Sequence, residues 1–207
     1  MTPKPALSLA DIDVVSRSVP HAGFLTVERY TLRHRLYAGG WTRPLDREVC
    51  VRGSASGVLP YDPERDAVVL VEQFRMGPFA VGEAPWMVEI VAGLIDPGET
   101  PEQVAVREAQ EECGCAVTAL LPITRYFPSP GSFAERVDVF CGRVDSREAP
   151  EAGGMPHDGE DIRVLVVPWR TAKRQLEQGG YANAATIIAL QWLALNRTRV
   201  RRAWLGA

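Results

Sequence analysis

The sequence lacks several features that would assign it quickly to a class. It has only four cysteines, and their spacing matches no zinc-binding pattern, so reduced and buried thiols are expected at Cys50, Cys113, Cys115 and Cys141. No apolar run is long enough to span a membrane, and no signal peptide is recognisable. We therefore expect a soluble, cytoplasmic protein with no membrane partner.

Clustered positive charge is also missing. The formal net charge is −3 at pH 7, and no basic stripe runs along the chain, so we expect no nucleic-acid partner. The arginines at 197–202 are interpreted as a solvated helix end. The 207 residues, 46% of them hydrophobic, suffice for one domain with a substantial core and an additional smaller piece.

The pattern of apolar and polar residues predicts many strands and few helices. Residues 1–20 contain proline and are expected to be irregular. Three helices are predicted, and the last is expected to bury a stripe that includes Leu190 and Leu195. This arrangement indicates a mixed α/β domain. The predicted strands lie within 24–36, 49–59, 67–74, 87–92, 117–121, 137–144 and 162–167, the helices at 100–113, 171–178 and 184–197, and the main loops at 76–85, 126–136 and 145–161.

The most informative stretch is GLIDPGETPEQVAVREAQEECGC at 93–115. A strand-like run precedes Gly93, and within the stretch a turn at 96–99 leads into a helix. Thr100 is a favourable N-cap, Pro101 occupies the first helical position, and Gln103 completes a capping box. Gly114 stands where a helix ends in the left-handed conformation. The stretch therefore predicts a strand, a loop, a helix and a stop signal in succession.

Three carboxylates share one face of this helix, because Glu108, Glu111 and Glu112 are three and four residues apart. Arg107 can pair with Glu111, but it cannot neutralise the whole cluster. A divalent cation can, and ligands that are all oxygen atoms favour Mg²⁺ or Mn²⁺ over zinc. The alternative is a solvated acidic helix face, and the cluster alone does not decide between the two.

The spacing of the whole stretch decides between them. Gly93, Glu99 and the run REAQEECGC at 107–115 resemble the Nudix box of the Nudix hydrolase superfamily. Ala109 and Cys115 stand where that box usually has bulky aliphatic residues, and both are apolar enough to pack. The resemblance implies an α/β/α sandwich over residues 53–207 that carries the metal site on the box helix. It also implies a small N-terminal β domain over residues 1–52 that serves in dimerisation.

Motifs outside the box resemble the bacterial ADP-ribose pyrophosphatases of that superfamily. Pro130 lies at the distance past the box that marks this subfamily, whereas Ser132 replaces a glycine that is common there. The resemblance implies Mg²⁺-dependent hydrolysis of ADP-ribose to AMP and ribose 5-phosphate by a homodimer with exchanged N-terminal domains. The motifs are RE at 47–48, VEQFR at 71–75, Trp86 and Glu89, SPG at 129–131, ER at 135–136, EDIRV at 160–164 and NAATIIALQW at 183–192.

The resemblance also implies roles for the acidic residues. Glu108 and Glu112 are the first metal ligands, the backbone carbonyl of Ala92 completes the site, and Glu111 holds a further ion directly or through water. Arg107 is interpreted as an orienting partner of these carboxylates. A bound cation would withdraw charge from the pyrophosphate and activate a water molecule.

The resemblance also implies a general base, a glutamate on the loop before a late strand. Glu160 is the preferred candidate in this loop, and Asp158 is the alternative. His157 in the same loop is interpreted as a solvent-exposed side chain.

Substrate contacts are implied at a second group of residues. Arg47 and Arg75 would bind phosphate, since guanidinium groups match phosphate oxygens. Glu135 would hold ribose hydroxyls, and Gly131 belongs to the neighbouring substrate loop. Phe24 would stack on adenine, or else it belongs to the core.

Two rival functions remain. The same chemistry could act on another nucleoside diphosphate sugar, such as ADP-glucose or GDP-mannose. A non-catalytic ADP-ribose sensor that regulates transcription is the rival from another class. The intact acidic cluster and the absence of a helix-turn-helix extension argue against the sensor.

Overall fold

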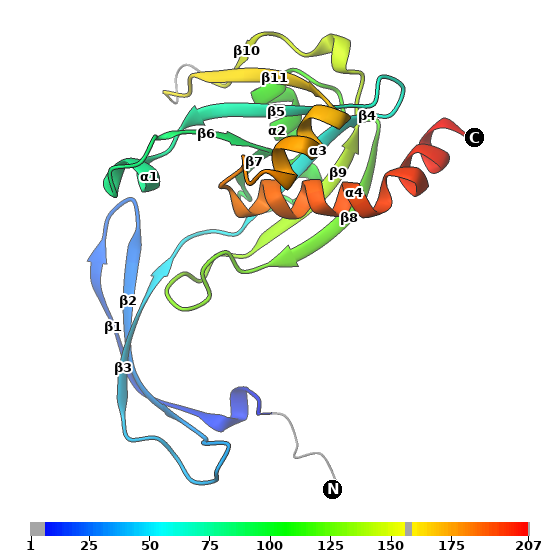
Figure 1. Cartoon of the computed structure of the whole chain (residues 1–207). Coiled ribbons are helices and arrows are strands. Elements are labelled where there is room, and N and C mark those ends of the chain that lie inside the picture. The colour runs from blue at the N-terminus through cyan, green and yellow to red at the C-terminus, as the bar shows by residue number, and fades with distance from the viewer. Residues whose placement is uncertain (1–6, 156–158, 207) are drawn as a thin grey trace, which may run out of the picture. The chain divides into compact units, whose positions relative to one another are not determined.

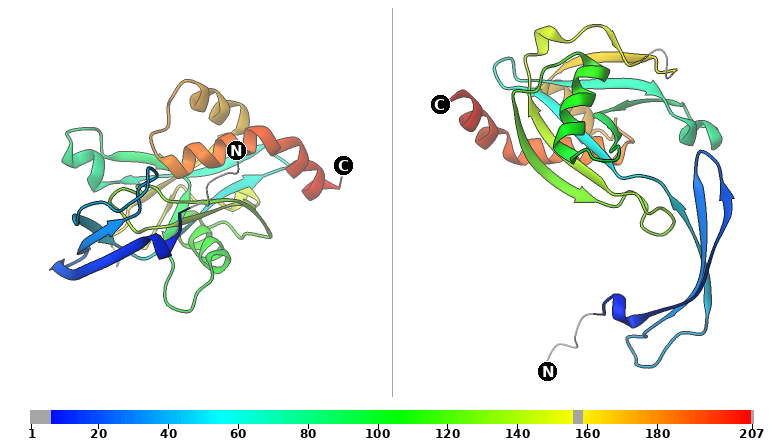
Figure 2. Two further views of the ribbon diagram at one scale, coloured as in Figure 1. Left: turned by 90° about the horizontal axis from the view of Figure 1, so that it is seen from below. Right: turned by 180° about the vertical axis from the view of Figure 1, so that it is seen from behind.

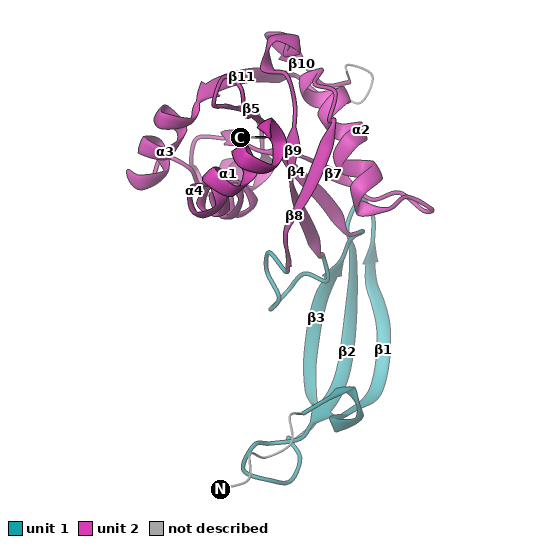
Figure 3. Cartoon of the chain, turned by 90° about the vertical axis from the view of Figure 1, so that its right-hand side faces the viewer, with its two compact units in different colours: residues 1–53, 127–135 teal, residues 54–126, 136–207 magenta. Residues whose placement is uncertain are grey.

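The structure is a computed structural model that describes residues 7–155 and 159–206. The chain divides into two compact units (Figure 3). Unit 1 comprises Met1–Gly53 and Phe127–Glu135, and unit 2 comprises Ser54–Tyr126 and Arg136–Ala207.

Unit 1 is a three-stranded antiparallel sheet in the order β1-β2-β3. Its elements are a short 3₁₀ helix η1 (Leu9–Asp11), β1 (Ile12–Ala22), β2 (Thr26–His34) and β3 (Leu45–Val51). The expectation of an irregular segment over residues 1–20 was wrong for β1. This strand pairs with β2 through two register shifts, between Val14 and Ser16 and between Ser18 and His21, which interrupt any simple alternation.

The loop at 127–135 belongs to unit 1 through backbone hydrogen bonds to β3. The Cys50 amide donates to the carbonyl oxygen of Ser132 at 2.8 Å, and the Ala134 amide donates to the carbonyl oxygen of Cys50 at 3.0 Å. Among the described residues of unit 1, no apolar side chain is buried. The buried side chain there is Glu28, which is 7% exposed and accepts hydrogen bonds from Arg17 and Tyr30.

Unit 2 is built on a mixed sheet in the order β10-β11-β5-β4-β9-β8, in which β4 and β9 pair in parallel and the other pairs among the described strands are antiparallel. Strands β4 and β5 pair at Tyr61–Val68 and Asp62–Ala67, beside the turn that joins them. Further along, β6 pairs with β5 and β7 pairs with β4. The strands are β4 (Ala55–Asp62), β5 (Ala67–Phe74), β6 (Trp86–Glu89), β7 (Val91–Leu94), β8 (Ala119–Tyr126), β9 (Val137–Arg143), β10 (Ala152–Gly153) and β11 (Ile162–Pro168).

Helices cover both faces of this sheet, which confirms the expected α/β/α sandwich. Helix α2 (Pro101–Cys113) lies on one face, and α3 (Trp169–Glu177) and α4 (Ala184–Leu205) lie on the other (Figures 1 and 2). Short helices also form at α1 (Met76–Ala80), within a segment expected to be a loop, and at η2 (Ser146–Glu148). In the described part of the chain, no helix is long and apolar enough to cross a membrane.

The core consists of two apolar clusters, one on each side of the sheet. Leu70 and Leu190 belong to the cluster beneath α3 and α4, whereas Val71 and Ala109 belong to the cluster beneath α2. Successive residues of β5 thus point to opposite faces. Helix α4 extends beyond the predicted end at residue 197, and the expected burial of Leu195 was wrong, because this side chain is 87% exposed.

Candidate active site

Helix α2 begins and ends as its sequence predicts. The Thr100 hydroxyl accepts a hydrogen bond from the Gln103 amide at 3.3 Å, and the Gln103 side chain accepts one from the Thr100 amide at 2.8 Å. Pro101 is the first helical residue, and Gly114 adopts a φ of +65° just after the helix. These caps fix the ends of the helix that carries the acidic cluster.

Arg107 is the centre of an ion-pair network at this helix. Its guanidinium donates to both carboxylate oxygens of Glu99, at 2.9 and 3.0 Å. It also donates to Glu108 at 2.8 Å and to Glu111 at 2.9 Å. The hydrogen bond to Glu99 is the main reason that the pKa of Arg107 is raised above its usual value. Arg107 therefore ties the loop before α2 to two carboxylates on the helix.

Glu112 lies deeper than its neighbours and has no cationic hydrogen-bond partner among the described residues. The residue is 3% exposed, and its Oε2 accepts a hydrogen bond from the Ala92 amide of β7 at 3.2 Å. Burial, and then the charge of Glu108, raise the pKa of Glu112 to about 8. Burial also raises the pKa of Glu108. Glu108 and Glu112 thus lie side by side, and little positive charge nearby stabilises their ionised forms.

Gly93 allows β7 to approach this pair. A Cβ atom at Gly93 would lie 1.7 Å from Oε1 of Glu108, so any side chain would displace the carboxylate. The backbone of Ala92 and Gly93 therefore lines the space next to Glu108 and Glu112.

The segment around β10 closes over the other end of the helix. A Cβ atom at Gly153 would lie 2.0 Å from the carbonyl oxygen of Glu112, and the Gly154 amide donates to the carbonyl oxygen of Glu111 at 3.1 Å. Oε2 of Glu160 accepts a hydrogen bond from the Met155 amide at 3.1 Å. Burial is the main cause of the raised pKa of Glu112, and the charge of Glu160 adds a smaller contribution. Glu160 therefore lies near the acidic pair. Asp158 and His157 lie outside the described residues.

These residues fit a hard divalent cation. In the described part of the chain, no three acidic, histidine or cysteine side chains form a ready-made metal cage. The donors that line the site are oxygen atoms, as Mg²⁺ or Mn²⁺ requires. A carboxyl with a pKa of about 8 holds a proton at pH 7 unless a positive charge replaces it, and a cation beside Glu108 and Glu112 would do so.

Arg75 belongs to the same region through Glu89. Its Nε donates to Oε2 of Glu89 at 2.7 Å, and Nδ2 of Asn183 donates to the other oxygen at 2.7 Å. Glu89 is 3% exposed, whereas the Arg75 side chain is 42% exposed. Although burial raises the pKa of Glu112, the charge of Arg75 opposes this rise, so the guanidinium lies near the carboxylate cluster. Arg75 is thus fixed by Glu89 and remains accessible to solvent.

The remaining predicted substrate residues lie in unit 1. Arg47 is exposed and donates to the carbonyl oxygen of Asp46 at 2.8 Å. Phe24 is 91% exposed, with the guanidinium of Arg52 5.7 Å from its ring centre, so the core interpretation of Phe24 was wrong. Gly131 and Glu135 lie in the loop at 127–135, which is hydrogen-bonded to β3. Unit 2 therefore brings together the acidic cluster, Ala92, Glu160 and Arg75, while Arg47, Phe24, Gly131 and Glu135 belong to unit 1.

Sequence reasoning assigned no role to three residues that shape this site. Glu89 and Asn183 were recognised only as parts of motifs, although they connect Arg75 to the start of α4. Gly153 was seen only as part of a polar loop. The pair of adjacent glycines at 153–154 was the one available signal of a close backbone approach.

A family comparison accounts for this arrangement. A model of the NUDIX domain matches residues 51–195. The chain belongs to the Nudix family. The match contains the strand β7, the capped helix α2 and the β10 segment around the acidic cluster.

Several Nudix relatives align with almost the whole chain. It is 41% identical over 194 residues to the ADP-ribose pyrophosphatase of Escherichia coli strain K12, covering 94% of this chain and 93% of the relative. It is 38% identical over 200 residues to the ADP-ribose pyrophosphatase of Haemophilus influenzae, covering 95% and 92%. The GDP-mannose pyrophosphatase of Cronobacter sakazakii is 37% identical over 150 residues, covering 72% and 78%.

The fold of this Nudix chain also resembles a solved structure. A crystal structure of an ADP compounds hydrolase superposes with a TM-score of 0.71 and covers 95% of this chain and 100% of the other, at 21% sequence identity. At that identity the similarity supports the fold alone.

Proposed function

We propose that this Nudix protein hydrolyses the pyrophosphate of ADP-ribose to AMP and ribose 5-phosphate, with Mg²⁺ or Mn²⁺ as cofactor. The observation that carries the proposal is the 41% identity over 94% of the chain to an ADP-ribose pyrophosphatase. The acidic cluster supports it, because Glu108, Glu111 and Glu112 lie together on α2 and Glu112 is buried beside β7.

In this proposal the carboxylates of Glu108 and Glu112 and the carbonyl oxygen of Ala92 hold the cation, with Glu111 at the edge of the site. The cation supplies charge neutralisation to the pyrophosphate and lowers the pKa of water. Arg107 holds Glu99, Glu108 and Glu111 in place through its four short hydrogen bonds. Loss of this arginine would leave the carboxylates free to repel one another.

Glu160 is the proposed general base. Its carboxylate takes the proton of the attacking water as a bond forms to one phosphorus, and the bridging P–O bond breaks. The hydrogen bond from the Met155 amide orients the carboxylate, and Glu160 lies close enough to affect the pKa of Glu112. Asp158 remains the alternative base.

The substrate contacts of the proposed enzyme are the residues that the Nudix resemblance implies. Arg75 and Arg47 bind the pyrophosphate, Glu135 accepts from ribose hydroxyls, and Gly131 offers close backbone approach. Phe24 stacks on adenine, and its exposed ring supports this role.

A homodimer with exchanged N-terminal β domains completes the sites in this proposal. Support comes from the sheet of unit 1, in which no described apolar side chain is buried. A small sheet without a packed face is marginally stable in water, so it needs a cover. Val14, Val15 and Val19 of β1 are each more than half exposed, at 52%, 60% and 51%, and offer such a surface.

The activity is tested with a panel of substrates: ADP-ribose, ADP-glucose, GDP-mannose and diadenosine polyphosphates. Phosphate release is measured through a coupled phosphatase with and without Mg²⁺. We expect Mg²⁺-dependent turnover with the highest kcat/KM for ADP-ribose. A preference for GDP-mannose would favour the second candidate, which the 37% identity to a GDP-mannose pyrophosphatase supports. Binding of ADP-ribose without turnover would favour the sensor.

The exchanged dimer is tested by mixing two inactive variants, Arg47→Ala and Glu112→Gln. If each site combines residues of two chains, a mixed dimer has one site with both changes and one with neither. Random exchange would then restore about a quarter of wild-type sites. If each site is built within one chain, every site carries a change, and mixing restores nothing. Light scattering measures the oligomeric state of each variant as a control.

A further inference from the structure

Gln73 on β5 carries a hydrogen-bonding group that the chain leaves unused. The residue is 7% exposed. Its Nε2 is the one buried side-chain nitrogen or oxygen that lacks a hydrogen-bond partner within the described residues. Other buried polar side chains of unit 2 do have partners, including Asp62, Glu89 and Thr186. Because an unpaired buried donor is costly, its retention points to a partner from outside the chain.

The side chain of Gln73 points to the face of the sheet that carries the acidic cluster. Val69 and Val71 pack in the cluster beneath α2, whereas Leu70 packs on the opposite side. Alternation along β5 therefore places Gln73 and Arg75 on the α2 side. On the opposite face Glu72 pairs with Arg163, with 3.0 Å between Nε and the carboxylate.

Strands β6 and β11, which pair with β5 on either side, lead to Glu89 and Glu160 of the proposed site. Across the sheet Gln73 stands opposite Met87 of β6, and β11 pairs alongside at Glu72–Arg163, from where the chain leads back to Glu160. Arg75 follows it on the same face and is held by Glu89. Glu112 accepts from the Ala92 amide, and Nε2 of Gln73 makes no hydrogen bond to it.

A neutral amide donor on the same face of the sheet as an arginine and the helix that carries the carboxylates suits an anionic ligand. It can donate to a phosphate oxygen without adding charge to the site, and its direction is fixed by the strand. We propose that Nε2 of Gln73 donates a hydrogen bond to a non-bridging oxygen of the substrate pyrophosphate. This inference rests on the proposed function and adds a substrate-binding residue to it.

The test compares Gln73→Met, which removes the donor at similar volume, with Gln191→Met, the same change on the exposed face of α4. Calorimetry measures binding of α,β-methylene ADP-ribose, a non-hydrolysable analogue, in the presence of Mg²⁺. We expect Gln73→Met to weaken binding at least ~10-fold, as for a lost hydrogen bond to a charged group. Gln191→Met should bind as the wild type does.

A second measurement separates binding from a structural role. The melting temperature of unliganded Gln73→Met should equal or exceed that of the wild type, because an unpaired buried donor has been removed. A third variant, Gln73→Glu, places a negative charge opposite the phosphate and should weaken binding further. AMP binding should fall in Gln73→Met while adenosine binding stays unchanged.

Several results would overturn the inference. Unchanged analogue binding in Gln73→Met would do so, and so would a lower melting temperature with unchanged binding, which indicates a structural or water-mediated role. An equal loss for AMP and adenosine would remove the phosphate assignment. If the wild-type protein neither binds the analogue nor hydrolyses ADP-ribose, the proposed function fails first, and the role of Gln73 in that function fails with it.

Discussion

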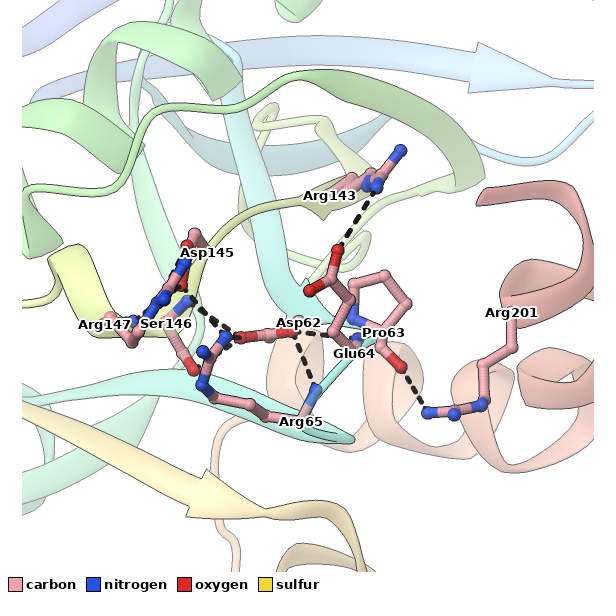
Figure 4. A network of polar contacts seen from close by, with 9 residues as sticks. All are labelled: Asp62, Pro63, Glu64, Arg65, Arg143, Asp145, Ser146, Arg147 and Arg201. Carbon is pink, nitrogen blue, oxygen red and sulfur yellow. Dashed lines mark hydrogen bonds and ion pairs between the residues drawn. The ribbon is translucent and has the colours of Figure 1, made fainter. Parts of the chain in front are cut away.

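Replacement of Asp62 by asparagine should destabilise unit 2 in a pH-dependent way. Asp62 ends β4 and is 1% exposed. Its carboxylate accepts hydrogen bonds from the backbone amides of Glu64 and Arg65, at 2.9 and 3.0 Å, and from the Arg65 guanidinium at 3.1 Å. It also accepts from the Ser146 amide at 3.0 Å and the Ser146 hydroxyl at 2.7 Å (Figure 4). One carboxylate therefore joins the β4–β5 turn to the segment after β9.

The size of the effect follows from the pKa of this group. Burial alone would raise it, but the hydrogen bonds from Arg65 and Ser146 outweigh burial and lower the pKa of Asp62 from 3.8 to about 2. This difference in pKa corresponds to about 2 kcal/mol of folding free energy. Solvent screens this contribution little, because the side chain is 2% exposed. Because the folded pKa is the lower one, this contribution is complete well above pH 3.8 and disappears as the pH falls through about 2.

Asparagine keeps the shape but turns one acceptor into a donor that faces other donors. We expect Asp62→Asn to lose roughly 2–4 kcal/mol of unfolding free energy at pH 7. At pH 3 about half of the ionic contribution is already gone, so the gap to the wild type should narrow. Urea denaturation at the two pH values measures both differences.

The control is Asp13→Asn, which removes an exposed ion pair with Arg33 whose aspartate is 45% exposed. We expect it to cost less than about 1 kcal/mol at either pH. A loss in Asp62→Asn that is equally large at pH 7 and pH 3 would refute the ionic argument. A loss below about 1 kcal/mol at pH 7 would refute the importance of the hydrogen bonds themselves.

Three further changes test the site. Glu112→Gln should lower kcat/KM at least ~100-fold without unfolding the protein, while Glu102→Gln, at an exposed position of the same helix, should leave activity unchanged; equal rates in the two variants would contradict the metal assignment. Gly93→Ala places a Cβ 1.7 Å from Oε1 of Glu108, so the rise in melting temperature on adding Mg²⁺ should shrink, and a wild-type rise would contradict the close approach. Asn183→Ala removes the N-cap of α4 and the donor to Glu89. It should cost about 1–2 kcal/mol in urea denaturation and raise KM through a less fixed Arg75, and an unchanged KM would separate Arg75 from the substrate.

The parts of the fold that could be predicted are those with a local physical signature. Helix α2 was predicted because Thr100, Pro101, Gln103 and Gly114 each satisfy a helix end within the chain itself. Strand β5 was predicted because apolar side chains continue along it and both faces are buried. Signals of this kind need no knowledge of distant residues.

Elements defined by distant partners were predicted poorly. Strand β1 exists through its pairing with β2, and its two register shifts remove the alternation that marks a strand. Beyond the predicted end of α4, Arg201 donates to the carbonyl oxygen of Pro63 and lies 3.6 Å from the carboxylate of Asp66, both in the β4–β5 turn. Because such contacts join residues far apart in sequence, they cannot be read from a local window.

Within the candidate site, the same limit applies to Gln73 but leaves a trace. Along β5 five buried apolar residues are followed by Glu72, which is half-buried, and Gln73, which is buried. Glu72 is explained by its ion pair with Arg163, whereas nothing within the described chain accepts from Gln73. A buried polar residue without a partner lowers stability, so it persists where a function offsets the loss. The break in the pattern of β5 therefore separates the residues that pack in the core from the residue that we propose to bind the substrate.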